Sequence, residues 1–404
     1  MENARIAIVA YSAPPFSAGG VASAHFNLFK AMQRRGFEAR LFTFGDDVWG
    51  DEEAIVRRGS PSWYKKFCYW LNGVVSALFG RGKTIYQVRD IFAGQWGARR
   101  MNKAIAEFDP QVVILSDHGA PGLALQKRQG MKVVLVSHHN PARFQDTVYF
   151  PDYSIGDTRL AIWLENRVMK KIDLVVCPSN YMAEWFQRTY RLAWPLRVIP
   201  NIVDDQTLED IQAFDLRPRM GLPASAPLIY LPSAGSRMKG AAFVPDLVRG
   251  LAEVAKGVIG FYMPGEVDES LRSLLQELPG RAWIHTPGQV EYSQHIAMVK
   301  TCSFGISPSL LENYSMALLE AVYCGVPMLA FASGGNPDII HPGKNGYLVR
   351  MGDTNELVEK AQTLLDPRSL AKLKQSTLQY SHKTLSPHRA VDGYIEAIEW
   401  LSPA

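Results

Sequence analysis

This chain of 404 residues has few cysteines, no long apolar run and little excess of charge of either sign. The four cysteines have neither C-x-x-C nor Cys/His metal-ligand spacing, which favours a reduced protein with structural thiols. No apolar run approaches the roughly 20 residues that a membrane-spanning helix needs. The net charge of +4 is too small to indicate a nucleic-acid-binding protein, so no nucleic-acid partner is expected.

The start of the chain also lacks two common signals. Residues 5–11 form a strand pattern with no signal peptide before it, so a cytoplasmic location is expected. The Gly/Pro/Ser-rich loop that follows does not match G-x-G-x-x-G, and we predict no dinucleotide fingerprint there. Gly19 and Gly20 nevertheless stand just before a helix, where glycine lets the backbone approach a ligand closely.

The length and a hydrophobic content of 47% are sufficient for two α/β domains that each bury a core. Strand patterns alternate with amphipathic helix patterns in both halves, which indicates parallel sheets covered on both faces. The predicted domains are residues 1–207 and 208–385, and residues 208–226 are predicted to be the linker. A closing helix is expected within residues 386–404.

The stretch Ser307–Pro327 combines groups that suit a phosphorylated sugar. It predicts the end of a buried strand, a polar loop and a helix that Gly325 closes. Glu312 in the loop and Glu320 in the helix supply carboxylates, which accept hydrogen bonds from sugar hydroxyls. Backbone N–H groups at the positive end of this helix are expected to bind a phosphate. These N–H groups belong to Asn313, Tyr314 and Ser315.

The same stretch reads P-S-x-x-E-x7-E-A-x-x-x-G-x-P and is followed by Gly334-Gly335. This pattern resembles the signature of retaining, nucleotide-sugar-dependent glycosyltransferases of family 4. A second segment, VIPNIVD, is similar to the family's I-P-N-G-V-D segment, with Ile202 where glycine is usual. The resemblance implies the GT-B fold, in which two Rossmann-like doubly wound domains face a central cleft. It further implies an N-terminal acceptor-binding domain, a C-terminal nucleotide-sugar-binding domain and a closing helix that packs back on the first.

The resemblance also implies roles for the charged residues of the second domain. Glu320 would hold the nucleotide ribose hydroxyls and Glu312 the hydroxyls of the transferred sugar. A departing diphosphate needs cations, and Lys239, predicted at a helix start, is the first candidate for this catalytic role. The family usually places an arginine five or six residues earlier, where this chain has Ser233 and Ala234. Either a nearby cation, Arg237, supplies the second positive charge, or the lysine acts with the helix dipole alone. The alternative is that Lys239 and Arg237 are ordinary solvated surface cations.

Two strand patterns of the first domain end in histidine. His118 resembles the family's cleft histidine, which would contact the donor sugar or its leaving oxygen. His139 with Asn140 resembles a strand-end His-Asp pair near the acceptor, although Asn replaces Asp and the register against His138 is ambiguous. Structural histidines are the alternative for each.

Two loops of the first domain are expected to lie near substrates. In the resembled family, a loop like Gly19-Gly20 lies near the donor phosphates and the acceptor; a flexible surface loop is the alternative. Residues 143–159 are polar and aromatic, as an acceptor-binding loop could be. No acid-x-acid motif follows a strand, and Asp46-Asp47 is only a loop pair, so no metal or other cofactor is expected.

Residues 57–103 have ten Lys or Arg against one acidic residue, with nine aromatic residues interleaved. Basic heads beside amphipathic rings suit an interface between water and anionic lipid. The apolar run Phe67–Phe79 is long enough to lie on a bilayer but not to cross it. We therefore expect peripheral contact with the inner face of the plasma membrane. A helical hairpin that covers the first sheet, or stacking on nucleic acid, are the alternatives.

Together with these features, the resemblance implies a retaining hexosyltransferase. It would move a hexose from a UDP- or GDP-type nucleotide sugar to a glycan or lipid-linked acceptor, in bacterial surface polysaccharide, lipopolysaccharide or glycolipid synthesis. The resemblance implies front-face transfer, in which a donor phosphate oxygen takes the acceptor proton. A nucleotide-sugar epimerase of the same fold, an inactive membrane-associated scaffold and a soluble glucosyltransferase remain as alternatives.

Overall fold

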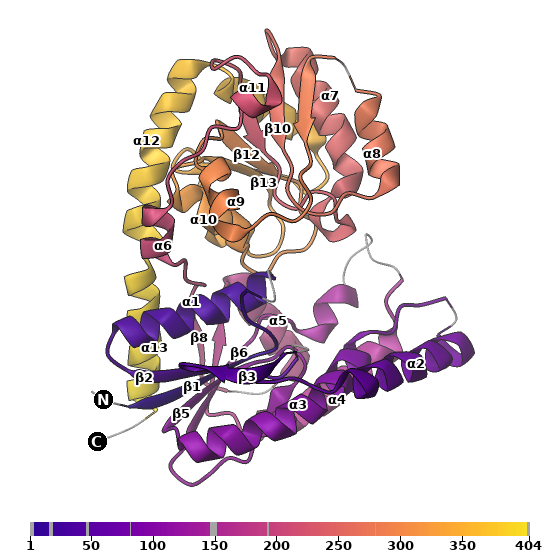
Figure 1. Ribbon diagram of the computed structural model, residues 1–404, viewed down its shortest axis with the longest axis vertical. Helices are drawn as coiled ribbons and strands as arrows, with labels where there is room; N and C mark the ends of the chain where they lie inside the picture. The colour runs from indigo at the N-terminus through magenta and orange to yellow at the C-terminus, as the bar shows by residue number, and fades with distance from the viewer. Residues whose placement is uncertain are drawn as a thin grey trace. The chain divides into compact units, whose positions relative to one another are not determined.

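The computed structural model describes residues 4–15, 19–45, 48–80, 82–145, 152–191, 194–278 and 280–401. The chain divides into two compact units (Figure 1). Unit 1 is Met1–Ile202 with Pro387–Ala404, and unit 2 is Val203–Ser386. The division therefore falls five residues before the predicted end of the first domain and one residue after the predicted end of the second.

Unit 1 is built on an eight-stranded sheet with the strand order β3-β4-β2-β1-β5-β6-β7-β8. Neighbouring strands are parallel except for the antiparallel pair of β3 and β4 at one edge. This pair leaves no signal in the sequence, because β3 reads WGDE and lacks an apolar pattern. The strands are β1 (Arg5–Ala10), β2 (Glu38–Thr43), β3 (Trp49–Glu52), β4 (Ile55–Arg58), β5 (Val112–Ser116), β6 (Lys132–Val136), β7 (Leu174–Cys177) and β8 (Leu196–Val198).

Helices cover both faces of this sheet (Figure 1). They are α1 (Gly20–Arg34), α2 (Ser62–Phe79), α3 (Gln87–Phe108), α4 (Ile155–Met169), α5 (Asn180–Tyr190) and α13 (Pro387–Trp400). Along β1, Ile6 and Ile8 belong to the core that includes residues of α1 and α13. Ala7 and Val9 belong to the opposite core, with residues of α3, α4 and α5. This alternation follows the two-residue period of a strand, and it makes the closing helix α13 part of unit 1.

Unit 2 repeats the plan with a six-stranded, all-parallel sheet in the order β11-β10-β9-β12-β13-β14. Its strands are β9 (Leu228–Tyr230), β10 (Ile259–Tyr262), β11 (Ala282–His285), β12 (Phe304–Ser307), β13 (Met328–Phe331) and β14 (Gly346–Val349). Its helices are α6 (Asp205–Asp210), α7 (Val244–Val254), α8 (Glu269–Gln276), α9 (Tyr292–Val299), α10 (Met316–Tyr323), α11 (Thr354–Leu364) and α12 (Pro367–Thr384). The predicted class, two doubly wound α/β domains, is confirmed.

The predicted loop, residues 143–159, is wrong at its C-terminal end, where α4 begins. Helix α4 begins at Ile155, and the Ser154 hydroxyl accepts a hydrogen bond from Asp157 N at 3.3 Å. The Asp157 carboxylate also accepts hydrogen bonds of 2.9 to 3.0 Å from three backbone N–H groups at the start of α3. Those groups belong to Tyr86, Gln87 and Val88. A carboxylate at the positive end of α3 stabilises both helices at their junction.

Two boundaries in unit 2 also differ from the prediction. The predicted linker, residues 208–226, overlaps the end of α6, which Asp204 caps by accepting from Thr207 N at 3.2 Å. The helix whose start was predicted at Lys239 begins only at Val244. Gly240 has a φ of +85°, which interrupts a continuous helix and leaves two short 3-10 turns ahead of α7.

Residues 57–103 form two helices with different surroundings. Helix α3 covers the sheet, with Ile91, Met101 and Ile105 among its core residues. Helix α2 lies against α3, and Lys65 is its one buried residue among those whose burial the structure describes. The alternative of a hairpin that covers the sheet therefore holds for α3 only. Among the described residues, no helix combines the length and the apolar character needed to cross a membrane.

Candidate functional site

The loop after β12 brings the predicted lysine and the first predicted glutamate together. Glu312 is buried, at 6% exposure. Lys239 Nζ donates a hydrogen bond to Glu312 Oε1 at 2.6 Å, and the Ser309 hydroxyl donates to the same oxygen at 2.7 Å. An ammonium group and a carboxylate therefore share one half-buried place in unit 2, where they can meet a phosphate and a sugar hydroxyl.

Glycine residues allow this loop to sit where it does. A Cβ atom on Gly334 would lie 1.9 Å from the Glu312 carbonyl oxygen, and one on Gly240 would lie 2.0 Å from the Pro308 carbonyl oxygen. Both glycines also have positive φ, +52° and +85°. Next to them, Leu310 N donates to the Met238 carbonyl oxygen at 2.9 Å, which ties the loop to the turn that carries Lys239. Gly334, which follows the sequence signature, and Gly240, which lies outside it, are thus both required for steric reasons.

The start of α10 lies later than the sequence predicted. The helix begins at Met316, and Ser315 is its N-cap, with a hydroxyl that accepts from Leu318 N at 3.5 Å. The N–H groups of Asn313, Tyr314 and Ser315 therefore lie ahead of the first helical turn and not within it. Tyr314 is buried, at 4% exposure, so its side chain fills the core below the loop.

The predicted place of Lys239 at an α-helix start is also wrong. Lys239 ends the 3-10 turn Arg237–Lys239, and α7 begins only at Val244. Arg237 is exposed in the same short turn, so both predicted cations come from one loop. The dipole of α7 therefore starts beyond the lysine, and the lysine charge itself is the main cationic feature here.

Glu320 lies on α10 and is 7% exposed. Burial raises the pKa of Glu320 to about 7, and a hydrogen bond from Tyr292 opposes part of that rise. The Tyr292 hydroxyl donates to Glu320 Oε1 at 3.0 Å. Tyr292 could not be predicted from the sequence, because it lies 28 residues away on another helix and belongs to no motif.

In unit 1 the structure brings His118 and His139 together. Their ring centroids lie 5.2 Å apart, and His118 also stacks on Tyr11 with centroids 4.6 Å apart. Both histidines line one small cavity, together with Asp90 and Glu165. Burial lowers the pKa of both imidazoles, so both are neutral at neutral pH. Burial also raises the pKa of the Glu165 carboxyl, which pairs with the Tyr190 hydroxyl.

Asp117 fixes the loop that carries His139, and the sequence analysis gave it no role. Its carboxylate accepts from His138 N at 3.0 Å, His139 N at 2.8 Å and Asn140 N at 3.3 Å. The Ser137 hydroxyl adds a fourth hydrogen bond at 3.1 Å. One carboxylate at the end of β5 therefore sets the backbone after β6, as neighbouring parallel strands allow.

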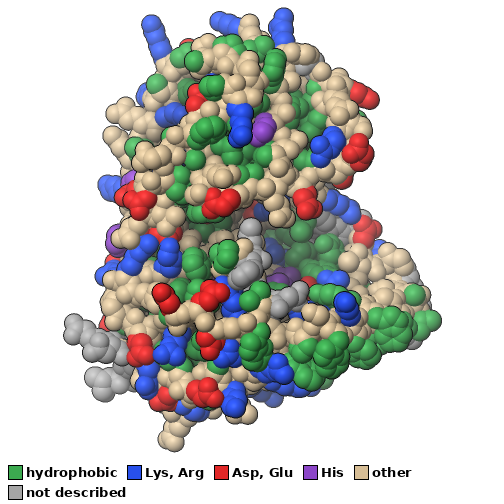
Figure 2. Space-filling model, viewed as in Figure 1, with side chains coloured by type: hydrophobic (Ala, Val, Ile, Leu, Met, Phe, Trp, Pro, Cys, Tyr) green, Lys and Arg blue, Asp and Glu red, His purple; other side chains and the backbone are tan. Residues whose placement is uncertain are grey.

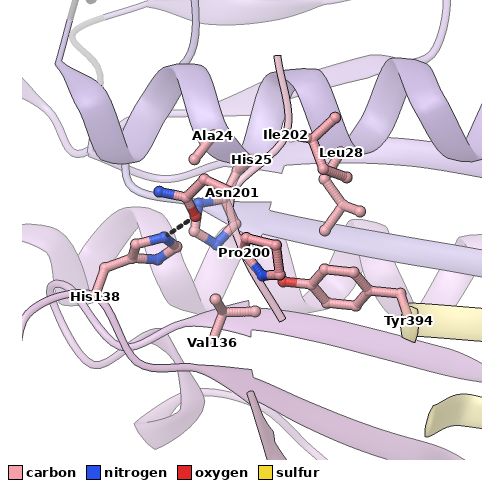
Figure 3. A pocket seen from close by; sticks show the side chains of 9 residues that line it. All are labelled: Ala24, His25, Leu28, Val136, His138, Pro200, Asn201, Ile202 and Tyr394. Carbon is pink, nitrogen blue, oxygen red and sulfur yellow. Dashed lines mark hydrogen bonds between the residues drawn. The ribbon is translucent and has the colours of Figure 1, made fainter. Parts of the chain in front are cut away.

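Of the two adjacent histidines, His139 is the one that lies with His118, because His138 points into a different hollow (Figure 3). His138 Nε2 is hydrogen-bonded to Asn201 Oδ1 at 2.8 Å, and its ring centroid lies 5.1 Å from that of His25. His25 Nδ1 donates to the Val21 carbonyl oxygen at 2.9 Å, whereas His25 Nε2 has no hydrogen-bond partner among the described residues. Tyr394 of α13 closes the other side of this hollow.

Other predicted residues have separate places. Asn140 is fully buried, and its Oδ1 accepts from Ala142 N and Thr189 Oγ1, both at 3.1 Å. These bonds give it a structural role in the loop. Gly19 is the N-cap of α1 and Gly20 its first residue, and both are exposed. Asp46 and Asp47 lie outside the described residues, as do parts of the predicted acceptor loop.

Comparison with known proteins gives the same two-part division. A family model described as Glycosyltransferase Family 4 matches residues 18–207, and one described as Glycosyl transferases group 1 matches residues 215–383. The structure resembles sucrose-phosphate synthase from Thermosynechococcus elongatus, with a TM-score of 0.75 over 99% of both chains at 18% identity. The chain belongs to the GT-B glycosyltransferases.

Relatives of this GT-B glycosyltransferase differ in length and in named activity. It is 26% identical over 316 residues to sulfoquinovosyl transferase SQD2 from Arabidopsis thaliana, a match that covers 74% of this chain and 59% of SQD2. The match thus spans less than two thirds of that relative. The solved structure of Anabaena HepE in complex with UDP and glucose is similar with a TM-score of 0.69 and 16% identity, over 98% of this chain and 100% of HepE.

Among the residues that the structure describes, no group of three or more His, Cys, Asp or Glu side chains could hold a metal ion in this glycosyltransferase.

Replacement of Gly334 by alanine tests the steric reading of the loop. Gly334→Ala should lower the free energy of unfolding by roughly 1–3 kcal/mol, since the new Cβ meets the Glu312 carbonyl oxygen and the positive φ is strained. Gly343→Ala is the matched control, because it shares a positive φ of +73° but has no atom within 4 Å of its new Cβ. Urea denaturation measures both, and equal losses would contradict the close approach.

The pair His25 and His138 predicts acid-sensitive stability for unit 1. Burial lowers the pKa of His25 from 6.5 to about 3, so below pH 6.5 the unfolded chain binds a proton that the folded chain does not. Stability is thus unaffected by His25 above pH 6.5 and falls as the pH is lowered, by about 2 kcal/mol at roughly pH 5. His25→Leu should reduce this slope in denaturation series, while His388→Leu at an exposed position of α13 should not. Parallel slopes for all three proteins would disprove the assignment.

Proposed function

We propose that the protein is a retaining hexosyltransferase that takes a hexose from a UDP- or GDP-type nucleotide sugar. The acceptor is a glycan or a lipid-linked glycan, and the product belongs to bacterial surface polysaccharide, lipopolysaccharide or glycolipid synthesis. We place the reaction in the cytoplasm, at the inner face of the plasma membrane. Neither a metal nor another cofactor is required in this proposal.

The observation that carries this proposal is the joined group of Lys239, Ser309 and Glu312. An ammonium and a carboxylate 2.6 Å apart offer charges of both signs to one ligand. A nucleotide sugar has both matching parts, since its diphosphate is anionic and its hexose presents hydroxyl donors. Glu320 on the helix that follows would accept hydrogen bonds from the ribose. Arg237 and the N–H groups of residues 313–315 complete the donor-binding set.

In the proposed reaction the bond between the hexose C1 atom and the diphosphate oxygen breaks. The acceptor oxygen forms its bond to C1 from the same face, and its proton moves to the departing phosphate oxygen. The released product is a nucleoside diphosphate. Because the acceptor oxygen bonds to C1 directly, no protein nucleophile is needed. Lys239 stabilises the charge that develops on the diphosphate, and Glu312 holds the hexose while the bonds exchange.

Unit 1 supplies the acceptor side of the proposed reaction. His118 and His139 line one cavity, and both imidazoles are neutral. They can therefore donate hydrogen bonds to hydroxyl groups or accept them, and they do not repel a nearby cation. His118 would meet the transferred sugar or its leaving oxygen, and His139 the acceptor. We assign Gly19 and Gly20, at the start of α1, to the approach of phosphate. Asn140 would then act through the loop that it stabilises.

Relatives give the proposal its substrate classes. The HepE structures contain UDP, UDP-glucose, or UDP with glucose, which supports a nucleotide-sugar donor. A relative from Mycolicibacterium smegmatis is 27% identical over 293 residues, which cover 68% of this chain and 72% of that protein. It is named a GDP-mannose-dependent phosphatidylinositol monomannoside mannosyltransferase, which supports a lipid-linked acceptor.

Lys239→Ala and Glu320→Ala should each lower transfer by at least ~100-fold, since each removes one preorganised polar contact to the donor. A thermal-shift screen against UDP-, GDP- and ADP-sugars finds the donor first, because binding stabilises the folded protein. Product formation from that donor is then followed by mass spectrometry. Lys256→Ala, an exposed lysine of the same unit, is the control and should keep its rate. Rates near wild type in both site variants would disprove the assignment of this donor site.

The exposed side of α2 supports the membrane part of the proposal. Side chains of this helix remain open to solvent although they are large and apolar, which is uncommon on a soluble surface. They are Trp63, Phe67, Tyr69, Trp70, Leu71 and Leu78, with exposed fractions of 44 to 69%. Figure 2 shows hydrophobic side chains gathered along the region where Figure 1 places α2. Lys66 and Arg89 add positive charge, and the Arg89 guanidinium lies 5.1 Å from the Tyr69 ring centroid.

A variant with Trp63, Phe67 and Trp70 all replaced by serine should lose binding to vesicles of phosphatidylglycerol, since rings that insert at the interface are removed. Flotation in a density gradient measures the bound fraction, and vesicles of phosphatidylcholine should bind the wild type weakly. Trp283→Ser, at a residue of β11 that is 44% exposed, is the control and should float as the wild type does. A wild type that stays at the bottom, or that forms dimers through α2 instead, would exclude the lipid surface.

A further inference from the structure

Tyr292 connects the surface of unit 2 with the buried carboxylate of Glu320. As a whole the residue is 39% exposed, but its hydroxyl reaches Glu320 Oε1 at 3.0 Å. We propose that Tyr292 is a positioning residue for the donor nucleotide: it holds one oxygen of Glu320 so that the other oxygen accepts the ribose hydroxyls. This inference rests on the proposed function, because it assumes that Glu320 binds ribose.

The need for a positioning group follows from the chemistry of glutamate. Its side chain has three rotatable bonds, and an ionised carboxylate can accept about four hydrogen bonds through two equivalent oxygens. A ribose offers two neighbouring hydroxyls, which must meet the carboxylate in a fixed orientation to gain the full hydrogen-bond energy. A tyrosine hydroxyl bound to Oε1 uses part of that capacity and fixes the carboxylate plane. Oε2 then remains as the acceptor for the nucleotide.

Helix α9 gives Tyr292 a rigid base. Tyr292 is its first residue, and Glu291 caps the helix by accepting from Gln294 N at 3.1 Å. Ile296, Ala297, Met298 and Val299 are buried and anchor the rest of the helix in unit 2. The tyrosine ring therefore leaves a fixed backbone position, 28 residues before Glu320 in the chain.

The electrostatic surroundings make the hydrogen bond important for the charge of Glu320. Burial raises its pKa to about 7, and the groups that sense its charge are Tyr292, Tyr230 of β9 and Cys324. Burial raises the pKa of all three as well, so they are neutral at neutral pH and provide no positive charge. A hydrogen bond from Tyr292 is thus the interaction that stabilises the ionised form.

The first test compares nucleoside diphosphates with and without ribose hydroxyls. Titration calorimetry on the full chain uses UDP, GDP and ADP, and then the 2′,3′-dideoxy form of the nucleotide that binds best. Tyr292→Phe should bind the ribonucleotide roughly tenfold more weakly than the wild type, since a hydrogen bond to a charged group is lost. The two proteins should bind the dideoxy form equally. Tyr347→Phe, a partly exposed tyrosine of β14, is the control and should match the wild type throughout.

The second test uses pH, which a purely structural role of Tyr292 would not move. Loss of the hydroxyl raises the pKa of Glu320 further, so protonation should weaken ribonucleotide binding at a higher pH in Tyr292→Phe. The midpoint of the affinity profile should shift upward by about one pH unit relative to the wild type. The phosphates of the nucleotide titrate equally in both proteins, so the difference between the profiles belongs to the carboxyl group.

Three results would overturn the inference, and they separate it from the proposed function. If the wild type binds the ribonucleotide and Tyr292→Phe has the same affinity and profile, Tyr292 has no positioning role while the proposed function stands. If the tenfold loss persists with the dideoxy form, the tyrosine acts through folding or the base and not through ribose. If the wild type binds none of the three nucleotides, both proposals fall. Thermal unfolding of each unliganded variant shows whether its fold is intact.

Discussion

Two carbonyl oxygens, those of Pro308 and Glu312, leave no space for a side chain on the backbone that packs against them. Glycine at residues 240 and 334 satisfies this constraint, and positive φ angles fit it as well. The close approach lets Leu310 bond to the turn that carries Lys239, and only then does the lysine reach the carboxylate of Glu312. The paired charges of unit 2 thus depend on the absence of two Cβ atoms.

Unit 1 positions its groups by a different means at the equivalent place, the carboxyl ends of parallel strands. Asp117 at the end of β5 accepts hydrogen bonds from three backbone N–H groups of the loop after β6. This bonding turns His139 toward His118 and leaves His138 with Asn201. Glycine shapes the loop after β12 in unit 2, and a carboxylate shapes the loop after β6 in unit 1. Both devices fix the backbone first and the functional side chains second.

The sequence allowed prediction of what depends on local pattern. Strands such as β1 and β6 read as apolar runs, and the glutamates of the loop and of α10 fall within one contiguous signature. Residues that act over long distances were missed for a physical reason. Asp157 caps a helix about 70 residues away, and Tyr292 bonds to Glu320 across 28 residues, so neither leaves a periodic or motif-like trace. Helix starts were misplaced where a cap or a left-handed glycine decided the boundary, as at Ser315 and Gly240.

The return of the chain from unit 2 to unit 1 has a consequence for synthesis. Residues of α13, together with Leu401 directly after it, complete the core around Ile6 and Ile8. Unit 1 therefore lacks part of its apolar burial until α13 has left the ribosome, although its sheet is synthesised first. Unit 2 is continuous in sequence and has all of its core available earlier. Unit 2 can thus complete its core before unit 1 does, and a nascent chain exposes the α13 side of the first sheet until α13 has been synthesised.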